Sequence, residues 1–136
     1  MAETPPILAR LRSGELTLLV ESGGAPTYMS DRPGFAPLRV LLFEHSTLLD
    51  GADVAMPAVG LAAAYILMHS KVGRLFVQHI SQEARRTLEE EGIEHHAASV
   101  AKKLPEDAAA VHEPLDARAR EAVTPLAFVE ELRRIP

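Results

Sequence analysis

The sequence predicts an α/β domain in three layers, with a mixed sheet of about five strands between helices. Residues 16–30 contain two apolar runs joined by a double-glycine turn, the pattern of a β-hairpin. From residue 52 onward, short apolar runs alternate with helical ones, which favours parallel strands joined by right-handed crossovers. The predicted order is therefore an N-terminal β-hairpin, a helix, and then β-α-β-α-β.

Length and composition support one compact unit. The chain has 136 residues, close to the commonest size of a domain, and 47% of them are hydrophobic, enough to build a core. Composition becomes more polar and richer in proline after Lys103. We expect residues 1–123 to form a single α/β domain and residues 124–136 to form a C-terminal helical extension.

Charge and cysteine content exclude several classes of function. A net charge of −5 gives no electrostatic reason to bind nucleic acid or an anionic membrane. The absence of cysteine excludes disulfides, thiol nucleophiles, iron–sulfur ligation and the usual structural zinc sites. The N-terminus lacks the pattern of a secretory signal, and the longest apolar stretch, 54–68, is shorter than the roughly 20 residues that span a bilayer. We therefore expect a cytoplasmic protein without a cofactor.

In the first half of the chain, residues 7–11 predict a short helix after two prolines. The hairpin turns at residues 23–24. Residues 38–49 have helical spacing of their apolar side chains, with Pro37 in the first turn.

The middle of the chain contains its most apolar segment. Residues 52–56 predict a short strand, and Pro57 is expected to open a helix that runs to about Ser70. This helix is apolar all round, which indicates burial on several sides. We expect it to be the most buried element.

The next elements carry clear boundary signals. Residues 73–80 predict a strand, followed by a helix with Ser81 as N-cap, Glu83 in its first turn and Gly92 just past its end. Residues 93–100 predict the last strand. Helices are then expected at 114–123 and 125–134; the second has Leu126, Val129 and Leu132 or Arg133 near one stripe, suited to self-packing or to a partner's groove.

This order of elements resembles the cytidine-deaminase-like fold. Four blocks also resemble the family called domain of unknown function 1893: "ELTLLVESGG", Gly34-x-x-Pro-Leu, "GADVA…VGLAAA" and "ISQEARRTLEEEGIE". The resemblance covers about residues 10–100 well and weakens to about 123. It implies a deaminase-like domain and a relationship to zinc deaminases, but no known reaction.

The chain departs from both patterns at the same place. Zinc deaminases have a His or Cys and then a Glu at the start of the helix after the central strand, and Pro-Cys-x-x-Cys at the next helix. Here the two positions read "MPAVGL" and "SQEA". The resemblance also implies an Asp-Lys pair where this chain has Met56-Pro57. We therefore expect no metal site, no stoichiometric zinc and no deamination of cytidine, adenosine or guanine.

Two interpretations of this apolar helix start remain open. In the first, the site is inactive and the helix simply packs in the core. In the second, a crevice persists and binds a ligand through backbone amides. In the second case, the N-termini of the two helices, at 58–60 and 82–83, face one crevice at the carboxyl edge of the sheet. Gly60, which has no side chain, lets a ligand approach the backbone closely. The candidate ligand-binding residues are then Gly34, Met56, Pro57, Gly60, Ser81 and Glu83.

A polar cluster at residues 112–116 adds three candidates. The resemblance implies Cys-Pro-Met-Glu here, whereas this chain has Glu113-Pro-Leu-Asp116, which keeps the proline and the acid. His112, Glu113 and Asp116 would line the crevice if the segment folds over it. An ordinary helix start has the same chemistry, with an acid near the cap and proline in the first turn.

Three functions follow from these alternatives. The first is a deaminase-fold protein without catalysis, a pseudoenzyme that binds a small molecule or a protein partner. The second is an enzyme that uses the His and carboxylates of residues 112–116. The third is a subunit of a larger assembly, either a homodimer or a complex that docks through residues 125–134.

Overall fold

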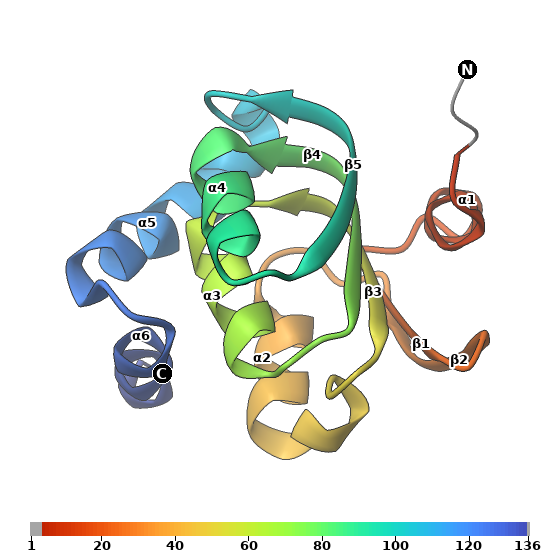
Figure 1. Ribbon diagram of the computed structural model, residues 1–136, viewed down its shortest axis with the longest axis horizontal. Helices are drawn as coiled ribbons and strands as arrows, with labels where there is room; N and C mark the ends of the chain where they lie inside the picture. Colours follow the sequence, from red (N-terminus) through yellow and green to blue (C-terminus); the bar gives the residue numbers. More distant parts are fainter. Residues whose placement is uncertain (1–3, 136) are drawn as a thin grey trace.

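The computed structural model describes residues 4–135, which form a five-stranded mixed sheet with helices on both faces (Figure 1). The strand order is β2-β1-β3-β4-β5, antiparallel from β2 through β3 and parallel from β3 through β5. This confirms the predicted mixed sheet, its hairpin and its β-α-β-α-β half. The elements are α1 (Pro6–Ser13), β1 (Leu18–Ser22), β2 (Ala25–Ser30), α2 (Ala36–Glu44), η1 (Ser46–Leu48), β3 (Asp53–Val59), α3 (Leu61–His69), β4 (Arg74–Ser81), α4 (Gln82–Glu90), β5 (Glu94–Ala101), α5 (Glu106–Ala122) and α6 (Pro125–Arg134).

The two faces of the sheet carry cores of unequal size. Successive side chains of a strand point to opposite faces, so Val54 and Met56 of β3 join the large core while Ala55 joins the small one. On the small side, α1 lies alone across the sheet and packs Leu8 and Leu11 against it. The remaining helices lie on the other side, as Figure 1 shows.

Helix α3 is the centre of the large core. Seven of its nine residues are buried, and Ala62, Ala63 and Ala64 have no exposed surface. The sheet covers one side of α3, and α5 and α6 cover the other (Figure 1). Small alanine side chains allow neighbouring elements to approach α3 closely on all these sides. The predicted burial of this helix is confirmed, although the helix is shorter than predicted.

Helix α6 packs on its own chain. Phe128, Val129 and Leu132 are buried in the core shared with α3, whereas Leu126 is 58% exposed. Thr124 caps the start of α6, since its hydroxyl accepts a hydrogen bond from the Ala127 N–H. The apolar stripe of α6 therefore packs against the core of its own chain. The domain boundary at residue 123 stays a prediction.

The prediction that Pro57 opens a helix is wrong, because β3 continues to Val59 and α3 begins at Leu61. Strand β1 pairs with β3 only along residues 53–55. Pro57 lies beyond that pairing and is exposed. No strand pairs with β3 on that side at this point, so the sheet loses no hydrogen bond there because proline has no N–H.

Two helix boundaries also differ from the prediction. Helix α5 begins at Glu106 and not at Pro114, which lies inside the helix. Proline there frees the carbonyl of Ala110, and both residues are exposed, so water can satisfy that oxygen. Helix α2 ends at Glu44, because His45 leaves the helical conformation with φ −141° before the short turn η1.

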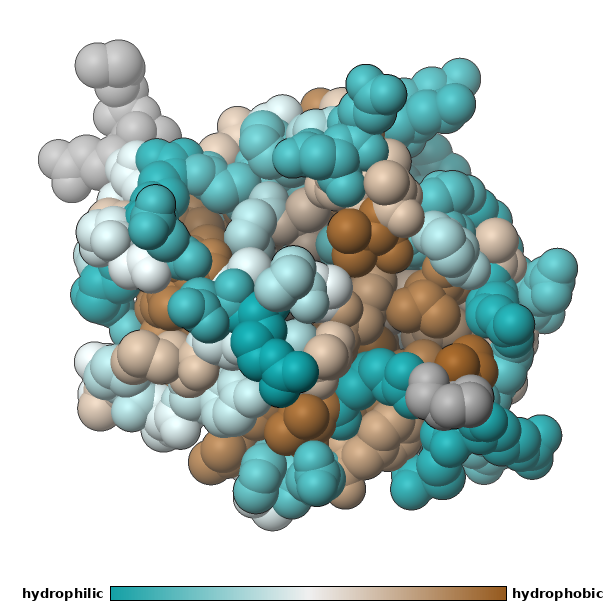
Figure 2. Space-filling model, turned by 180° about the vertical axis from the view of Figure 1, so that it is seen from behind, coloured by the Kyte–Doolittle hydropathy of each residue, from teal (hydrophilic) through white to brown (hydrophobic). Residues whose placement is uncertain are grey.

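Apolar side chains gather on one part of the surface. Figure 2 shows brown and tan side chains adjoining one another from the middle to the right of the face seen from behind, with teal polar side chains around them. No helix within residues 4–135 is both long and apolar enough to cross a bilayer. The large exposed apolar residues are Met29, Val100, Val111, Val123 and Leu126.

Replacing Ala63 of α3 by Asp should prevent folding. The substitution places an unpaired charge where the side chain has no exposed surface, at a cost of several kcal/mol. The measurement is the yield of soluble protein and its thermal unfolding. Ala117→Asp, on the exposed face of α5, is the control and should behave like the wild type. Normal yield and melting of the Ala63 variant would contradict the core assignment.

Candidate functional site

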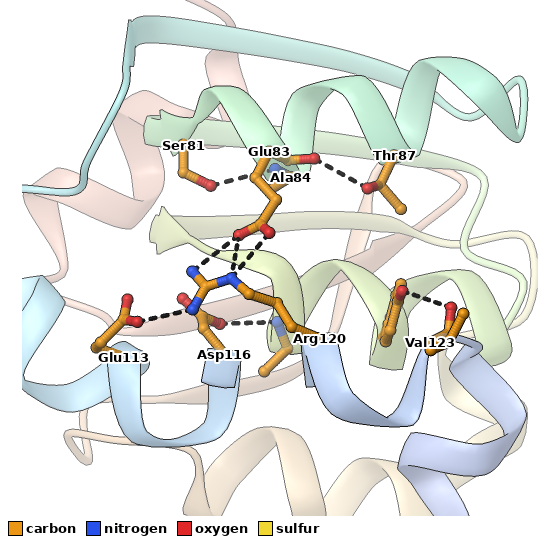
Figure 3. Close-up of polar contacts among 10 residues, drawn as sticks. Ser81, Glu83, Ala84, Thr87, Glu113, Asp116, Arg120 and Val123 are labelled. Atoms are coloured by element: carbon orange, nitrogen blue, oxygen red, sulfur yellow. Dashed lines mark hydrogen bonds and ion pairs between the residues drawn. The ribbon is translucent and has the colours of Figure 1, made fainter. Parts of the chain in front are cut away.

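A buried carboxylate caps the start of α3. Asp116 of α5 is 4% exposed, and its Oδ1 accepts a hydrogen bond of 2.8 Å from the Ala62 N–H (Figure 3). Gly60, the residue before α3, provides the room, since a Cβ there would collide with Asp116 Oδ2. The chain therefore fills this helix N-terminus with its own acid, which complements the free N–H groups and the positive end of the helix dipole.

Helix α4 begins beside α3 with a cap of its own. Ser81, the last residue of β4, accepts a hydrogen bond of 3.1 Å at Oγ from the Ala84 N–H. This confirms the predicted N-cap. Because β3 and β4 are parallel, α3 and α4 both start at the same edge of the sheet.

Arg120 joins α5 to α4. Its guanidinium donates to both carboxylate oxygens of Glu83, with Nε–Oε2 and Nη2–Oε1 distances of 2.9 Å, and Nη1 donates to Glu113 Oε1 at 2.8 Å (Figure 3). The hydrogen bond from Arg120 lowers the pKa of Glu113. Arg120 and Glu113 lie on the same helix as Asp116, so their contacts with Glu83 of α4 fix α5 across the edge of the sheet.

The two buried titratable groups of α5 are shifted in opposite senses. Burial raises the pKa of Asp116 to about 6, and the hydrogen bond from Ala62 opposes only part of that rise. Burial lowers the pKa of His112 to about 4. His112 packs edge-on against the ring of Phe35, with 4.8 Å between ring centroids, and its Nδ1 has no partner among residues 4–135. Both groups therefore favour the neutral form near pH 5.

A pocket of about 430 Å³ opens between α5, the start of α4 and the segment after β5. Its volume falls in the range typical of small-molecule sites, roughly 300–1,000 Å³. Acids and bases both line it, but Lys102 and Lys103 have no ion-pair partner among the described residues. The lining residues are Ser81, Glu83, Lys102, Lys103, Leu104, Ala109, Glu113, Asp116 and Arg120.

The structure brings most of the predicted candidates together. Gly60, Ser81, Glu83, Glu113 and Asp116 gather at the carboxyl edge of the parallel strands, as the predicted crevice requires.

The other candidates lie elsewhere. His112 is on the same helix as Asp116 but turns toward Phe35. Gly34 precedes that phenylalanine in a loop with φ +81°. Met56 is buried in the core, and Pro57 is exposed on β3. These four do not line the pocket.

Sequence reasoning missed Lys102, Lys103 and Arg120. Arg120 follows Glu113 by seven residues and Asp116 by four, the spacing of one helix face. That signal was hidden because the helix was predicted to begin at Pro114, which removed Glu113 from it.

Within residues 4–135, no three His, Asp or Glu side chains converge as metal ligands would. The corrected start of α3 presents Gly60, Leu61 and Ala62, and the start of α4 presents Ser81 to Ala84. Neither start supplies an imidazole or thiolate toward the pocket.

Comparison with known proteins now identifies the family. Residues 7–102 match the family described as domain of unknown function (DUF1893). The chain belongs to this family. A solved structure of the DUF1893 family protein TM1506 from Thermotoga maritima is similar in fold, with a TM-score of 0.80 and 22% identity, over 93% of this chain and 84% of that chain. A comparison with curated proteins gave no match.

The predicted resemblance to DUF1893 is thus confirmed. The matched region ends before α5, so the helix that supplies Asp116 and Arg120 lies beyond the part of the chain that the family model covers.

The stability of this DUF1893 domain should respond to Asp116→Asn in a pH-dependent way. Because the pKa of Asp116 is higher in the folded state, this group stabilises the fold fully at pH values below its unfolded pKa of 3.8. That contribution is lost as the pH rises through the folded pKa of about 6. Asn keeps the acceptor for Ala62 but cannot ionise. The free energy of unfolding of the variant should therefore rise relative to wild type by about 2 kcal/mol between pH 4 and 7. Chemical denaturation at several pH values measures this difference.

In His112→Leu, the free energy of unfolding relative to wild type should change with pH in the opposite direction. A lowered histidine pKa gives stability above the unfolded value of 6.5 that is lost as pH falls through about 4. Relative to wild type, the Leu variant should therefore gain stability on acidification from pH 7 to 4. Parallel pH profiles of the two variants would contradict the opposed shifts.

Gly60→Ala should act through Asp116. The backbone of Gly60, with φ −103°, suits alanine, so any cost comes from displacing the carboxylate and losing its cap. We expect a loss of about 2 kcal/mol in the wild type. In an Asp116→Ala background the same change should cost much less, giving a coupling energy above about 1 kcal/mol in a double-mutant cycle. Additive losses would show that the two residues do not interact.

Proposed function

We propose that this DUF1893 protein is a non-catalytic member of the cytidine-deaminase-like fold that binds a small anionic molecule in the pocket beside α5. The single observation that carries the proposal is the Asp116 carboxylate at the start of α3. In a zinc deaminase, this helix start supplies a metal ligand and the catalytic Glu. Here the chain's own acid occupies that helix start.

The deaminase-like assignment is supported by the order and pairing of the elements. An antiparallel hairpin joins three parallel strands, and the crossover helices α3 and α4 lie on one face of the sheet. The start of α4 lines the pocket directly, and the start of α3 lies behind Asp116, which lines the same pocket.

The proposed ligand class follows from the charges of the pocket. Arg120 is already neutralised by Glu83 and Glu113, and Asp116 is bound to the Ala62 N–H. Lys102 and Lys103 are the cations left available, and Ser81, the N-cap of α4, lines the same pocket. A phosphate or carboxylate group suits that combination, and the second oxygen of Asp116 is free to accept a hydrogen bond from the rest of the ligand.

An enzyme is the second candidate, and the pKa of Asp116 favours it. A carboxyl group with a pKa of about 6 in a pocket is suited to move a proton near neutral pH. Incubation with a small-molecule extract of cells separates the two functions. Catalysis predicts a time-dependent change in the extract that Asp116→Asn abolishes, whereas binding alone predicts depletion without a product.

Native mass spectrometry of protein taken from cells tests the binding proposal. We expect a bound small molecule in the wild type and its loss in the Lys102→Glu/Lys103→Glu double variant, because the anion would then face two carboxylates. Lys71→Glu/Arg86→Glu changes the net charge equally at exposed positions outside the pocket, and it should keep the ligand. Equal occupancy in both double variants would place the ligand elsewhere, and an empty wild type would count against a resident ligand.

A further inference from the structure

The outer side of β5 is an open sheet edge. β5 pairs with β4 on one side, and no backbone hydrogen bond joins its other side to any residue between 4 and 135. The strand has eight residues, and most of them are exposed. A row of free N–H and C=O groups of this length is a template for pairing with another strand.

This edge lacks the features by which proteins block such pairing. Between Glu94 and Lys102 there is no proline and no Lys, Arg, Asp or Glu. The opposite edge of the sheet differs, because β2 contains Pro26 and its register with β1 shifts between Val20 and Glu21. Proline and bulges protect an edge, so β2 is protected and β5 is not.

The side chains of β5 are self-complementary in the antiparallel sense. His96 stacks on Phe76, which lies in the small core with α1, so the even-numbered residues of β5 face the α1 side. If Ala98 lies on a two-fold axis, His96 lies opposite Val100 of a second copy. Glu94, the first residue of β5 and a partner of His96 in its own chain, then lies near Lys102 of the second copy, which follows the last strand residue, Ala101. Opposite charges then flank a centre of small and apolar side chains, the arrangement that stabilises cross-strand pairs.

Helix α4 shows the same complementarity. Glu83 reaches toward α5, and Ala84 and Leu88 point into the core, so at 100° per residue Arg85 and Glu89 lie on the flank toward the open edge. Strands lie about 4.8 Å apart, so a second β5 would bring the two α4 helices to about 10 Å, a normal packing distance. The helices would be antiparallel. The ion pair that Arg85 and Glu89 form within each α4 would then lie beside the same pair of the other copy in reversed order, so that Arg85 of each faces Glu89 of the other.

We propose that β5 is the interface of a homodimer, in which the β5 strands of two copies pair antiparallel about a two-fold axis through Ala98. The two sheets then form one continuous sheet. The occupant of the edge is a second copy of this chain because its charges match themselves on both β5 and α4. This inference does not rest on the ligand proposed for the pocket, although Lys102 takes part in both proposals.

The first test uses charge at the proposed axis. Ala98 is exposed, so Ala98→Lys and Ala98→Glu should fold normally, which thermal unfolding checks. Light scattering should give the wild type about twice the chain mass of 14.8 kDa. Each variant should dissociate at least about tenfold more readily, because like charges then meet. An equimolar mixture of the two should recover the dimer mass, and Ala25→Lys on β2 should remain dimeric.

The second test introduces a single cysteine into a chain that has none. Ala98→Cys should form an intermolecular disulfide under mild oxidation, because residues opposite each other in antiparallel strands lie 4.5–5.5 Å apart at Cα. Ala25→Cys is the matched control on β2 and should not crosslink. A monomeric wild type, an unchanged dimer in Ala98→Lys, or crosslinking through Ala25 instead of Ala98 would each overturn the proposal.

Discussion

The hydrogen bond from the Ala62 N–H to Asp116 links the core of this protein to its surface pocket. Helix α3 is buried on nearly every side, so water cannot satisfy the N–H groups at its start, and an unsatisfied buried donor costs about 1–3 kcal/mol. A side chain from α5 meets that need because Gly60 has no Cβ. The same bond fixes α5 over the edge of the sheet, and α5 then supplies half of the charged side chains that line the pocket.

This arrangement has an electrostatic consequence. The acid that satisfies α3 is itself withdrawn from water, and one hydrogen bond from a helix N-terminus does not restore what hydration provided, so the pKa of Asp116 remains raised. Four residues earlier, burial beside Phe35 keeps His112 neutral. The packing that holds α5 in place therefore shifts the pKa values of both inner-face groups toward their neutral forms. The ion pairs of Arg120 lie on the half-exposed face, where solvent screens them.

Most of the sheet could be predicted from the sequence, but the structural roles of two prolines could not. Strand alternation, the Ser81 cap and the double-glycine turn are local signals, and each predicted its element correctly. Pro57 and Pro114 were both interpreted as helix starts, yet one lies in a strand and the other inside a helix. A proline can take either position only where no neighbouring strand or turn needs its missing N–H as a hydrogen-bond donor. Whether that is so depends on contacts made by distant segments of the chain. Gly60, Ser81 and Glu83 were expected to gather because parallel strands end at one edge, and the structure places them together. Glu113 and Asp116 were expected there only if their segment folds over the crevice, which α5 does. Arg120 was missed because its helix was predicted too short.

The pocket and the open edge share one segment, and this connects the two proposals physically. Lys102 directly follows β5 and lines the pocket. In the proposed dimer it lies near Glu94 of the second copy, so its charge would be partly neutralised there. Lys103, the next residue, has no such role at the proposed interface and remains available for an anion. A ligand bound through Lys103 alone would bind equally well to monomer and dimer, whereas a ligand that requires both lysines would compete with Glu94 for Lys102. Dimerisation as proposed would therefore weaken only those ligands that need both lysines.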